Sequence, residues 1–342
     1  MIKTSKTFVI LIEIYFHIYI FFENKRLLFS LNNKNYKIFN SINNELQKIN
    51  KKRINNIDSL YIIGSFNFGN YIICLNNAII LCEFFHCKRI IIQSNKNIFI
   101  NNKIFYQKYN LTIESNYKFI PNNNSLELDL YFLFFQLNFS SLGNVNRFHI
   151  FREEILNNLP KIKVHPNDLY IYIRGGDIFK VLNVEFKTYP QPPLCFYENL
   201  LNKYKFREIR IISEDKLNPI LILLEKHYDI KYIRNNIKID ISYLANSYNI
   251  VLAKSSFVVS IIKLNYNLKF VWEYDFYKLS ERFYHLHHSV YTFPFKYTIY
   301  KLKASESYKT LMLPFKNSEK QRKLMIEEKC DDNFYIIPPR IS

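Results

Sequence analysis

The sequence predicts an α/β protein of two domains, each with a parallel sheet. The chain has 342 residues, more than one domain of ordinary size contains. Strand-like runs alternate with helix-like runs along most of it, and parallel sheets with right-handed crossovers produce this pattern. Apolar residues make up 49% of the chain, which is enough for a sizeable core.

Composition divides the chain into five parts. Residues 1–25 are expected to be a membrane anchor or signal segment, residues 26–56 a stem or linker, residues 57–160 an N-terminal α/β domain, residues 161–300 a C-terminal α/β domain, and residues 301–342 a polar tail or final helix. The segment from Pro160 to Pro166 is the expected hinge between the domains.

The N-terminal apolar run covers Phe8 to Phe22 and has lysines on both sides. It is short for a membrane span of about 20 residues and it contains Glu13 and His17. No small-residue cleavage site follows, so we expect an uncleaved signal-anchor, a single-pass type II topology and a lumenal remainder in the Golgi or ER. A buried strand or helix of the core is the alternative. The sequons at Asn110, Asn123 and Asn138 are compatible with a lumenal location.

The formal net charge is +18, which favours anionic partners such as phosphorylated substrates or anionic lipid. The lysines are scattered, and no arginine-rich run, finger spacing or basic helix is present, so nucleic acid is not an expected partner. The five cysteines indicate neither a zinc site nor a full disulfide framework. The histidines between Tyr284 and His288 have no matching ligand set, so no metal is expected there.

The first domain begins with a strand–helix–strand unit. Ser59–Ile63 is the first expected strand, Ile72–Phe85 the helix and Lys88–Gln93 the second strand. A loop with two glycines precedes the helix and places Asn70 at its N-terminus, where its amide either caps the helix or contacts a ligand. The spacing fits neither a dinucleotide-binding fingerprint nor a P-loop.

The second domain is organised around a strand at Leu169–Ile173 and the turn that follows it. The turn runs from Arg174 to Asp177 and contains two of the five glycines in the chain, which predicts a positive φ or a close approach to a ligand. An arginine at the carboxyl end of a parallel strand lies where open α/β sheets bind ligands, and its planar fork suits a phosphate. An Arg–Asp pair that merely closes a turn is the alternative.

Further strands and helices follow in alternation. The expected strands are Phe206–Ser213, Ile230–Ile233, Ile250–Leu252 and Phe270–Trp272, and the expected helices are Leu194–Tyr204, Pro219–His227 and Asp240–Asn246, with another helix that begins near Ser255. In a parallel sheet, the turns after successive strands open on one edge. That edge is expected to hold Arg174, Asp177, Glu214, Asp215, Ser255 and Ser256.

Ser255 and Ser256 come at the expected start of a helix. Their hydroxyls and the free N–H groups of the helix can bind an anion. Together with Arg174 they make a diphosphate clamp that needs no metal. The alternative is that Ser255 is a plain N-cap.

Three segments resemble a known family when they are taken in order. They are GNY at residues 69–71 with the helix around Ala78, YIRGGD at residues 172–177, and DISYLANSYNIVLAKSSF at residues 240–257. They resemble motifs of the GDP-fucose-dependent fucosyltransferases, the superfamily of α1,2-, α1,6- and protein O-fucosyltransferases. The resemblance covers roughly residues 58 to 275. Tyr172 stands where the family usually has His, and Gly175 replaces a second Arg.

The resemblance implies a GT-B-like architecture, in which two Rossmann-like domains with parallel sheets face a cleft. It implies that the first domain lies on the acceptor side, that the second binds the nucleotide sugar, and that a sugar passes without a metal from a donor such as GDP-fucose to a glycan or glycoprotein hydroxyl. An inactive GT-B-fold protein that binds a glycan or nucleotide is the alternative, because of Tyr172.

The resemblance also implies roles for individual residues. Arg174 would hold the donor β-phosphate, Asp177 would orient Arg174 or the turn, Asp240 would contact the base or ribose, Asn70 the donor or acceptor, and Ser255, Ser256 and Phe257 the phosphate and nucleoside. The general base is not placed by any pattern. Glu83, Glu185, Glu214 and Asp215 are the acids available for it.

Overall fold

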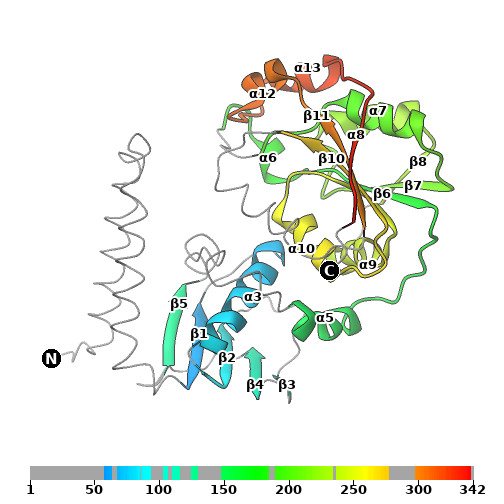
Figure 1. Ribbon diagram of the computed structural model, residues 1–342. Helices are drawn as coiled ribbons and strands as arrows, with labels where there is room; N and C mark the ends of the chain where they lie inside the picture. Colours follow the sequence, from blue (N-terminus) through cyan, green and yellow to red (C-terminus); the bar gives the residue numbers. More distant parts are fainter. Residues whose placement is uncertain are drawn as a thin grey trace. The chain divides into compact units, whose positions relative to one another are not determined.

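The computed structural model describes residues 58–63, 68–84, 86–93, 103–106, 110–115, 125–129, 148–184, 189–233, 236–276 and 297–339 (Figure 1). The fold is α/β with sheets that are mostly parallel, as the sequence predicts. The predicted anchor and stem and the histidines between Tyr284 and His288 lie outside the described residues. Among the residues that are described, no helix is both long enough and apolar enough to cross a membrane.

Contacts divide the chain into two compact units. The first comprises residues 1–63, 81–94 and 103–128, and the second comprises residues 64–80, 95–102 and 129–342. Helix α3 (Phe68–Phe84) is therefore shared, because its first part belongs to the second unit and its last residues to the first.

The first unit has a sheet in the order β3-β4-β2-β1-β5. Its strands are β1 (Ser59–Ile63), β2 (Arg89–Gln93), β3 (Lys103–Tyr106), β4 (Leu111–Ser115) and β5 (Ser125–Asp129). Strands β1, β2 and β4 are parallel neighbours, and β3 is antiparallel to β4. The predicted strand–helix–strand unit is confirmed, whereas β3 to β5 were not predicted. A disulfide joins Cys82 to Cys87 where the chain passes from α3 to β2.

The second unit is built on a sheet in the order β12-β11-β10-β9-β6-β7-β8. Its strands are β6 (Asp168–Tyr172), β7 (Glu208–Ile212), β8 (Ile230–Ile233), β9 (Asn249–Leu252), β10 (Phe270–Asp275), β11 (Thr298–Lys303) and β12 (Tyr335–Ile337). All of them run parallel except β12, which is antiparallel to β11. Numbered from β6, the parallel strands have the order 3-2-1-4-5-6, which is the order of a Rossmann sheet.

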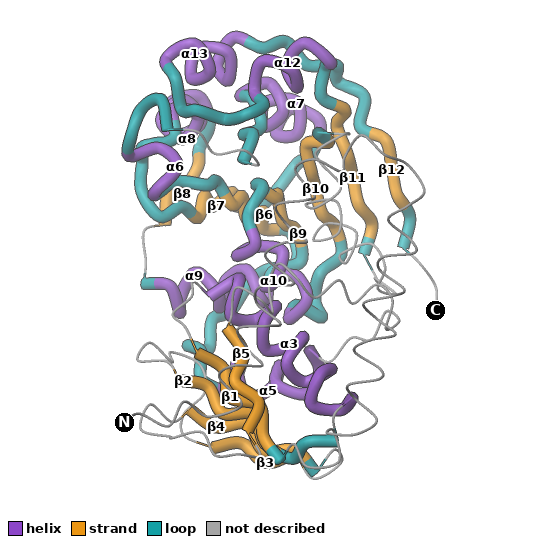
Figure 2. The backbone as a smooth tube through the Cα atoms, turned by 90° about the vertical axis from the view of Figure 1, so that its left-hand side faces the viewer, coloured by secondary structure: helices purple, strands orange, loops and turns teal. Residues whose placement is uncertain are grey.

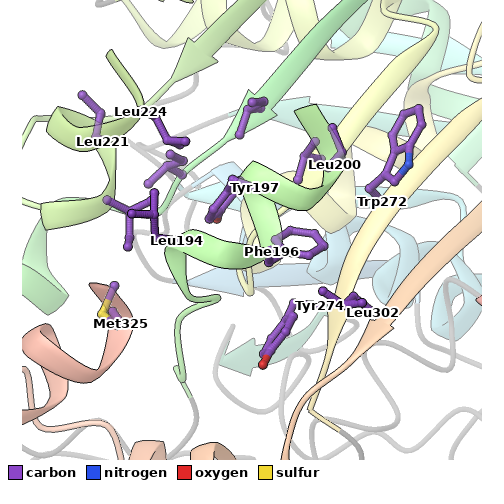
Figure 3. Packing of buried hydrophobic residues seen from close by; sticks show 14 of the residues in the cluster. Leu194, Phe196, Tyr197, Leu200, Leu221, Leu224, Trp272, Tyr274, Leu302 and Met325 are labelled. Carbon is purple, nitrogen blue, oxygen red and sulfur yellow. The ribbon is translucent and has the colours of Figure 1, made fainter. Parts of the chain in front are cut away.

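Helices cover both faces of this sheet (Figure 2). Side chains alternate along β6, so Leu169 and Ile171 join the main apolar core, while Tyr170 and Tyr172 lie on the opposite face. The core face is covered by α7 (Leu194–Lys203), α8 (Pro219–His227), α12 (Glu306–Met312) and α13 (Glu319–Glu327). Figure 3 shows residues of α7, α8, α13, β10 and β11 that meet in this core.

The tyrosine face is covered by α9 (Ile237–Asn246) and α10 (Ser256–Leu264). Tyr243 of α9 stacks on Tyr170 with ring centroids 5.6 Å apart. Helix α5 (Phe148–Asn157) is held to α10 by Arg152, whose Nε donates to the carbonyl of Leu264 over 2.7 Å.

Residues 301–342 were expected to be a polar tail or a final helix. They form the end of β11, helices α12 and α13 and strand β12, and Tyr308 and Phe315 are fully buried in the main core. A disulfide from Cys195 in α7 to Cys330 ties this region to the sheet's helix layer. The contribution to the core is not evident from composition because the apolar residues that carry the packing are spread among lysines and serines.

Candidate functional site

The switch point of the sheet lies between β6 and β9. These strands are neighbours, with Leu169 opposite Asn249 and Ile171 opposite Val251. From β6 the chain continues to β7 on one side, and from β9 it continues to β10 on the other. Because the two connections leave in opposite directions, a crevice forms outside the carboxyl ends of the strands, and open α/β proteins bind their ligands there.

The turn after β6 contains both glycines for a steric reason. Gly176 has a φ of +69°, as the sequence predicts, and a Cβ atom there would lie 2.0 Å from Oε2 of Glu214. A Cβ atom on Gly175 would lie 2.6 Å from Oδ1 of Asp215. The backbone of the two glycines therefore lies close to the side chains of Glu214 and Asp215, which follow β7. This packing fixes the turn against the neighbouring strand.

The carboxylate of Asp215 accepts hydrogen bonds from the backbone around it. Its Oδ2 accepts from the N–H of Gly176 over 3.1 Å and its Oδ1 from the N–H of Leu217 over 3.0 Å. The Ser213 hydroxyl donates to the Asp215 carbonyl over 2.9 Å. These bonds give Asp215 a structural task in shaping the edge. Of the other acids considered as a general base, Glu214 packs on Gly176, the side chain of Glu83 in α3 is not described, and Glu185 lies outside the described residues.

Arg174 follows the carboxyl end of β6, at the edge where the crevice lies. It is largely buried, with its side chain 15% exposed. Its Nη2 donates to Oδ1 of Asp177 over 2.6 Å, and Asp177 itself is 66% exposed. Its guanidinium carbon lies 5.8 Å from the ring centroid of Tyr189. The Nε atom is buried without a hydrogen-bond partner among the described residues. The Arg–Asp pair that closes the turn is thus present, and it leaves part of the guanidinium available.

Tyr172 lies on the α10 face of β6. Its ring centroid is 5.3 Å from that of Phe257, in the first turn of α10. Burial is the main cause that raises its pKa above the ordinary tyrosine value, so the phenol stays protonated at neutral pH. In the sequence, Tyr172 is evident only as a departure from the family motif. The alternation along β6, which puts it on the α10 face, is the signal that could have identified it.

Ser255 is the N-cap of α10. Its Oγ accepts from the N–H of Phe257 over 3.2 Å. Its plain capping role is therefore confirmed. Ser255 follows β9, which is the neighbour of β6 in the sheet. Ser256 is the first residue of the helix. The first N–H groups of α10, which have no partner within the helix, belong to this same edge.

Asp240 lies on α9, which covers the same face of the sheet. The prediction that Asp240 opens this helix is wrong by about one turn: Asn236 is the N-cap, and its side chain accepts from the N–H of Ile239. Oδ1 of Asp240 is buried without a partner among the described residues, and burial raises the pKa of Asp240 to about 7. Asp240 forms no recorded bond to Arg174 or Ser255, so the structure does not join it to that cluster.

Asn70 lies within the first turn of α3, which begins at Phe68. The carbonyl of its neighbour Gly69 accepts from the hydroxyl of Ser260 over 2.8 Å, in a buried bond within the second unit. Ser260 is on α10, about one turn after Ser256. The first turn of α3 is therefore packed on the helix whose N-terminus belongs to the candidate site.

No group of three or more His, Cys, Asp and Glu side chains suited to a metal occurs within the described part of the chain. In comparisons with known proteins, the chain matches no protein-family model, and no curated protein matches it. Fold and site together define an α/β protein that has a Rossmann-ordered sheet and a buried arginine at its switch point.

Proposed function

We propose that the chain is a glycosyltransferase that moves a sugar, fucose, from a GDP-linked donor to a hydroxyl of a glycan or glycoprotein, without a metal. In this proposal the two α/β units form a GT-B pair, in which the second binds the nucleotide sugar and the first serves the acceptor. The observation that carries it is the buried guanidinium of Arg174, which follows β6 at the switch point of a Rossmann-ordered sheet, where the neighbouring strand β9 leads into α10.

The chemistry of sugar transfer from a nucleotide requires such a site. As the glycosidic bond breaks, negative charge builds on the departing diphosphate. An arginine fork and the unpaired N–H groups of a helix stabilise that charge, and they do so more strongly where water is partly excluded. Arg174, whose Nε has no partner among the described residues, and α10 supply these groups. Asp177 orients Arg174 through its ion pair.

The remaining donor contacts follow from the resemblance and from burial. A nucleobase offers N–H groups, and Asp240 has a buried carboxylate oxygen with no partner among the described residues. Phe257, whose ring lies against Tyr172, offers an aromatic surface to the nucleoside. Asn70 is assigned to the donor or acceptor, because its helical turn is packed on α10.

The disulfides support a lumenal location. Four of the five cysteines are paired, in the bonds Cys82–Cys87 and Cys195–Cys330, although the sequence indicated no full disulfide framework. Such bonds persist in the secretory compartments and are rare in the cytosol. The proposed Golgi or ER location, with the membrane reached through the N-terminal segment, is consistent with them.

An inactive descendant that binds a nucleotide or glycan is the second candidate. Tyr172 favours it, because a phenol whose pKa is raised by burial cannot take up a proton near neutral pH, as the family histidine can. Turnover of a labelled GDP-sugar, in the presence of acceptor glycans, separates the two candidates.

The test of the donor site is calorimetry of the full-length protein with GDP, UDP, ADP and CMP in EDTA. We expect saturable GDP binding that weakens about 10- to 100-fold in Arg174→Ala, because a charge-assisted pair to phosphate is lost. The GDP affinity of Arg174→Lys is expected to lie between that of the unaltered protein and that of Arg174→Ala, because lysine keeps the charge and lacks the planar guanidinium. Arg152→Ala, which removes an arginine of α5 in the same unit, is the control and should bind normally.

Two results would redirect the assignment. Binding of UDP alone would keep a nucleotide-sugar site and discard fucose. A folded protein that binds none of the four nucleotides would contradict a donor site altogether, and it would leave a glycan-binding protein as the better account.

A further inference from the structure

A polar cavity of about 280 Å³ lies at the carboxyl ends of β10 and β11. Its walls come from the end of β10, the turn from β11 into α12, and the segment that follows α13. The polar residues that line it include Lys303, Ser305, Glu306, Lys329, Asp331 and Asn333. None of them belongs to the turn of Arg174 or to the N-terminus of α10, so the cavity is separate from the candidate donor site.

The wall that follows α13 is fixed to α7. The disulfide between Cys195 and Cys330 joins the two covalently, and Nδ2 of Asn199 in α7 donates to the carbonyl of Asp331 over 3.0 Å. The N–H and the Nδ2 of Asn333 both donate to Oδ1 of Asp331, over 3.1 and 2.9 Å. Because this wall is ordered by the protein itself, less entropy is lost when a ligand binds to it.

The charges in the cavity are unevenly paired. Glu306 accepts from Nζ of Lys309 over 2.9 Å, and Asp331 accepts from within its own turn. Lys303 and Lys329 are exposed, and their ammonium groups form no ion pair or hydrogen bond with any residue in the described part of the chain. Two unpaired cations among paired carboxylates give the cavity a positive potential, which attracts an anion.

The lining also offers groups that bind hydroxyls. Ser305, Glu306 and Asp331 bring a hydroxyl and carboxylate oxygens to the same cavity as the two lysines, and such oxygens accept hydrogen bonds from a sugar ring. The volume is close to the lower end of small-ligand pockets, roughly 300 Å³, so it suits a single sugar unit better than an oligosaccharide or a nucleotide.

We propose that this cavity binds an acidic sugar, a hydroxylated ring that carries a carboxylate or a phosphate. Lys303 and Lys329 hold the anionic group, and the oxygens of Ser305, Glu306 and Asp331 accept from the ring hydroxyls. The inference goes beyond the proposed function and does not depend on it, because no residue is shared with the donor site.

The test is calorimetry of the full-length protein with glucuronate, glucose 6-phosphate and neutral glucose. We expect saturable binding of the two acids and none of glucose, and the acid that binds more tightly identifies the anionic group. Lys303→Gln and Lys329→Gln should each weaken binding about tenfold, because a charge-assisted hydrogen bond is lost. The control is Lys320→Gln, which changes an exposed lysine of α13 that does not line the cavity and should bind normally.

Four results would overturn the inference. They are equal affinity for glucose and glucuronate, the same loss of affinity in Lys320→Gln as in Lys303→Gln, inorganic phosphate that binds as tightly as glucose 6-phosphate, and a folded protein that binds neither acid.

Titration of GDP on the same samples keeps the two proposals apart. Lys303→Gln and Lys329→Gln should bind GDP as the unaltered protein does. GDP binding without binding of either acid would contradict the cavity and leave the donor site standing. Binding of an acidic sugar without GDP binding would support the cavity and contradict the donor site.

Discussion

Asp240 is the acid in the described part of the chain whose surroundings most change its titration. Burial raises its pKa to about 7, whereas an exposed aspartate titrates near pH 4. Between those values the folded protein binds more protons than the unfolded chain. The contribution of Asp240 to the free energy of unfolding therefore falls as the pH rises from about 4 to 7, and this contribution is level above that.

Asp240→Asn should remove this dependence. An asparagine cannot ionise, so the variant is expected to be more stable than the unaltered protein at pH 8 by about 1 to 2 kcal/mol, a figure that allows for the water that reaches this half-buried group. At pH 4 the two should be nearly equal. Urea denaturation at both pH values measures the difference. Identical pH profiles for the two proteins would contradict a buried, titrating Asp240.

The same substitution also reports on the proposed donor site. If Asp240 contacts a nucleobase, Asp240→Asn should weaken GDP binding at pH 8 while it stabilises the protein. A variant that gains stability and loses GDP affinity would show that Asp240 destabilises the free protein and serves ligand binding. Unchanged GDP affinity would assign Asp240 to the packing of α9 alone.

At the scale of elements, the N-cap residue of α10 is also a residue of the proposed donor site. Ser255 caps it by accepting from the N–H of Phe257, whose ring lies against Tyr172. Ser318 caps α13 in a similar way, through the N–H of Gln321 over 3.2 Å, on the other face of the sheet. The two serines have the same local role in different surroundings.

Ser255→Ala and Ser318→Ala should therefore separate capping from ligand binding. Each is expected to lower the free energy of unfolding by about 1 kcal/mol, because a helix N–H loses its acceptor. Only Ser255→Ala should also weaken GDP binding, by severalfold. Thermal denaturation and calorimetry on both variants measure the two effects. Equal GDP affinity in both would limit Ser255 to its capping role.

At the scale of the whole molecule, Cys195–Cys330 closes a loop across 135 positions of sequence, whereas Cys82–Cys87 closes one of 5. A crosslink restricts the unfolded chain more when the loop is longer. The long bond joins α7 to the segment after α13, so it holds together the two ends of the second unit's helix layer.

Replacing Cys195 and Cys330 by serine should cost about 2 to 5 kcal/mol of stability, and replacing Cys82 and Cys87 clearly less. Urea denaturation of the two double variants, without reductant, makes the comparison. Mass mapping of unreduced peptides checks the pairing itself. Cys74 is the fifth cysteine, and it is buried and outside the two disulfides.

Much of the second unit follows from local pattern. Helix α8 and strand β8 have the predicted bounds, and β6 was expected from its alternating aromatic and branched residues. Glycine and proline indicate the turns because their backbone preferences are local and do not depend on the tertiary structure. The edge that gathers Arg174 and Ser255 could also be predicted, since parallel strands present their carboxyl ends together.

The remaining features depend on contacts between residues far apart in sequence. The strand order that puts β9 next to β6, the contact between the rings of Tyr172 and Phe257, and the pairing of Cys195 with Cys330 are of this kind. The acids packed against Gly175 and Gly176 follow the neighbouring strand β7. The C-terminal residues belong to the main core, although their composition does not indicate it. The sequence by itself determined the α/β class and the turn that carries Arg174, because those depend on near neighbours. Tertiary structure alone decided what surrounds that turn, because burial and partners are set by the whole sheet.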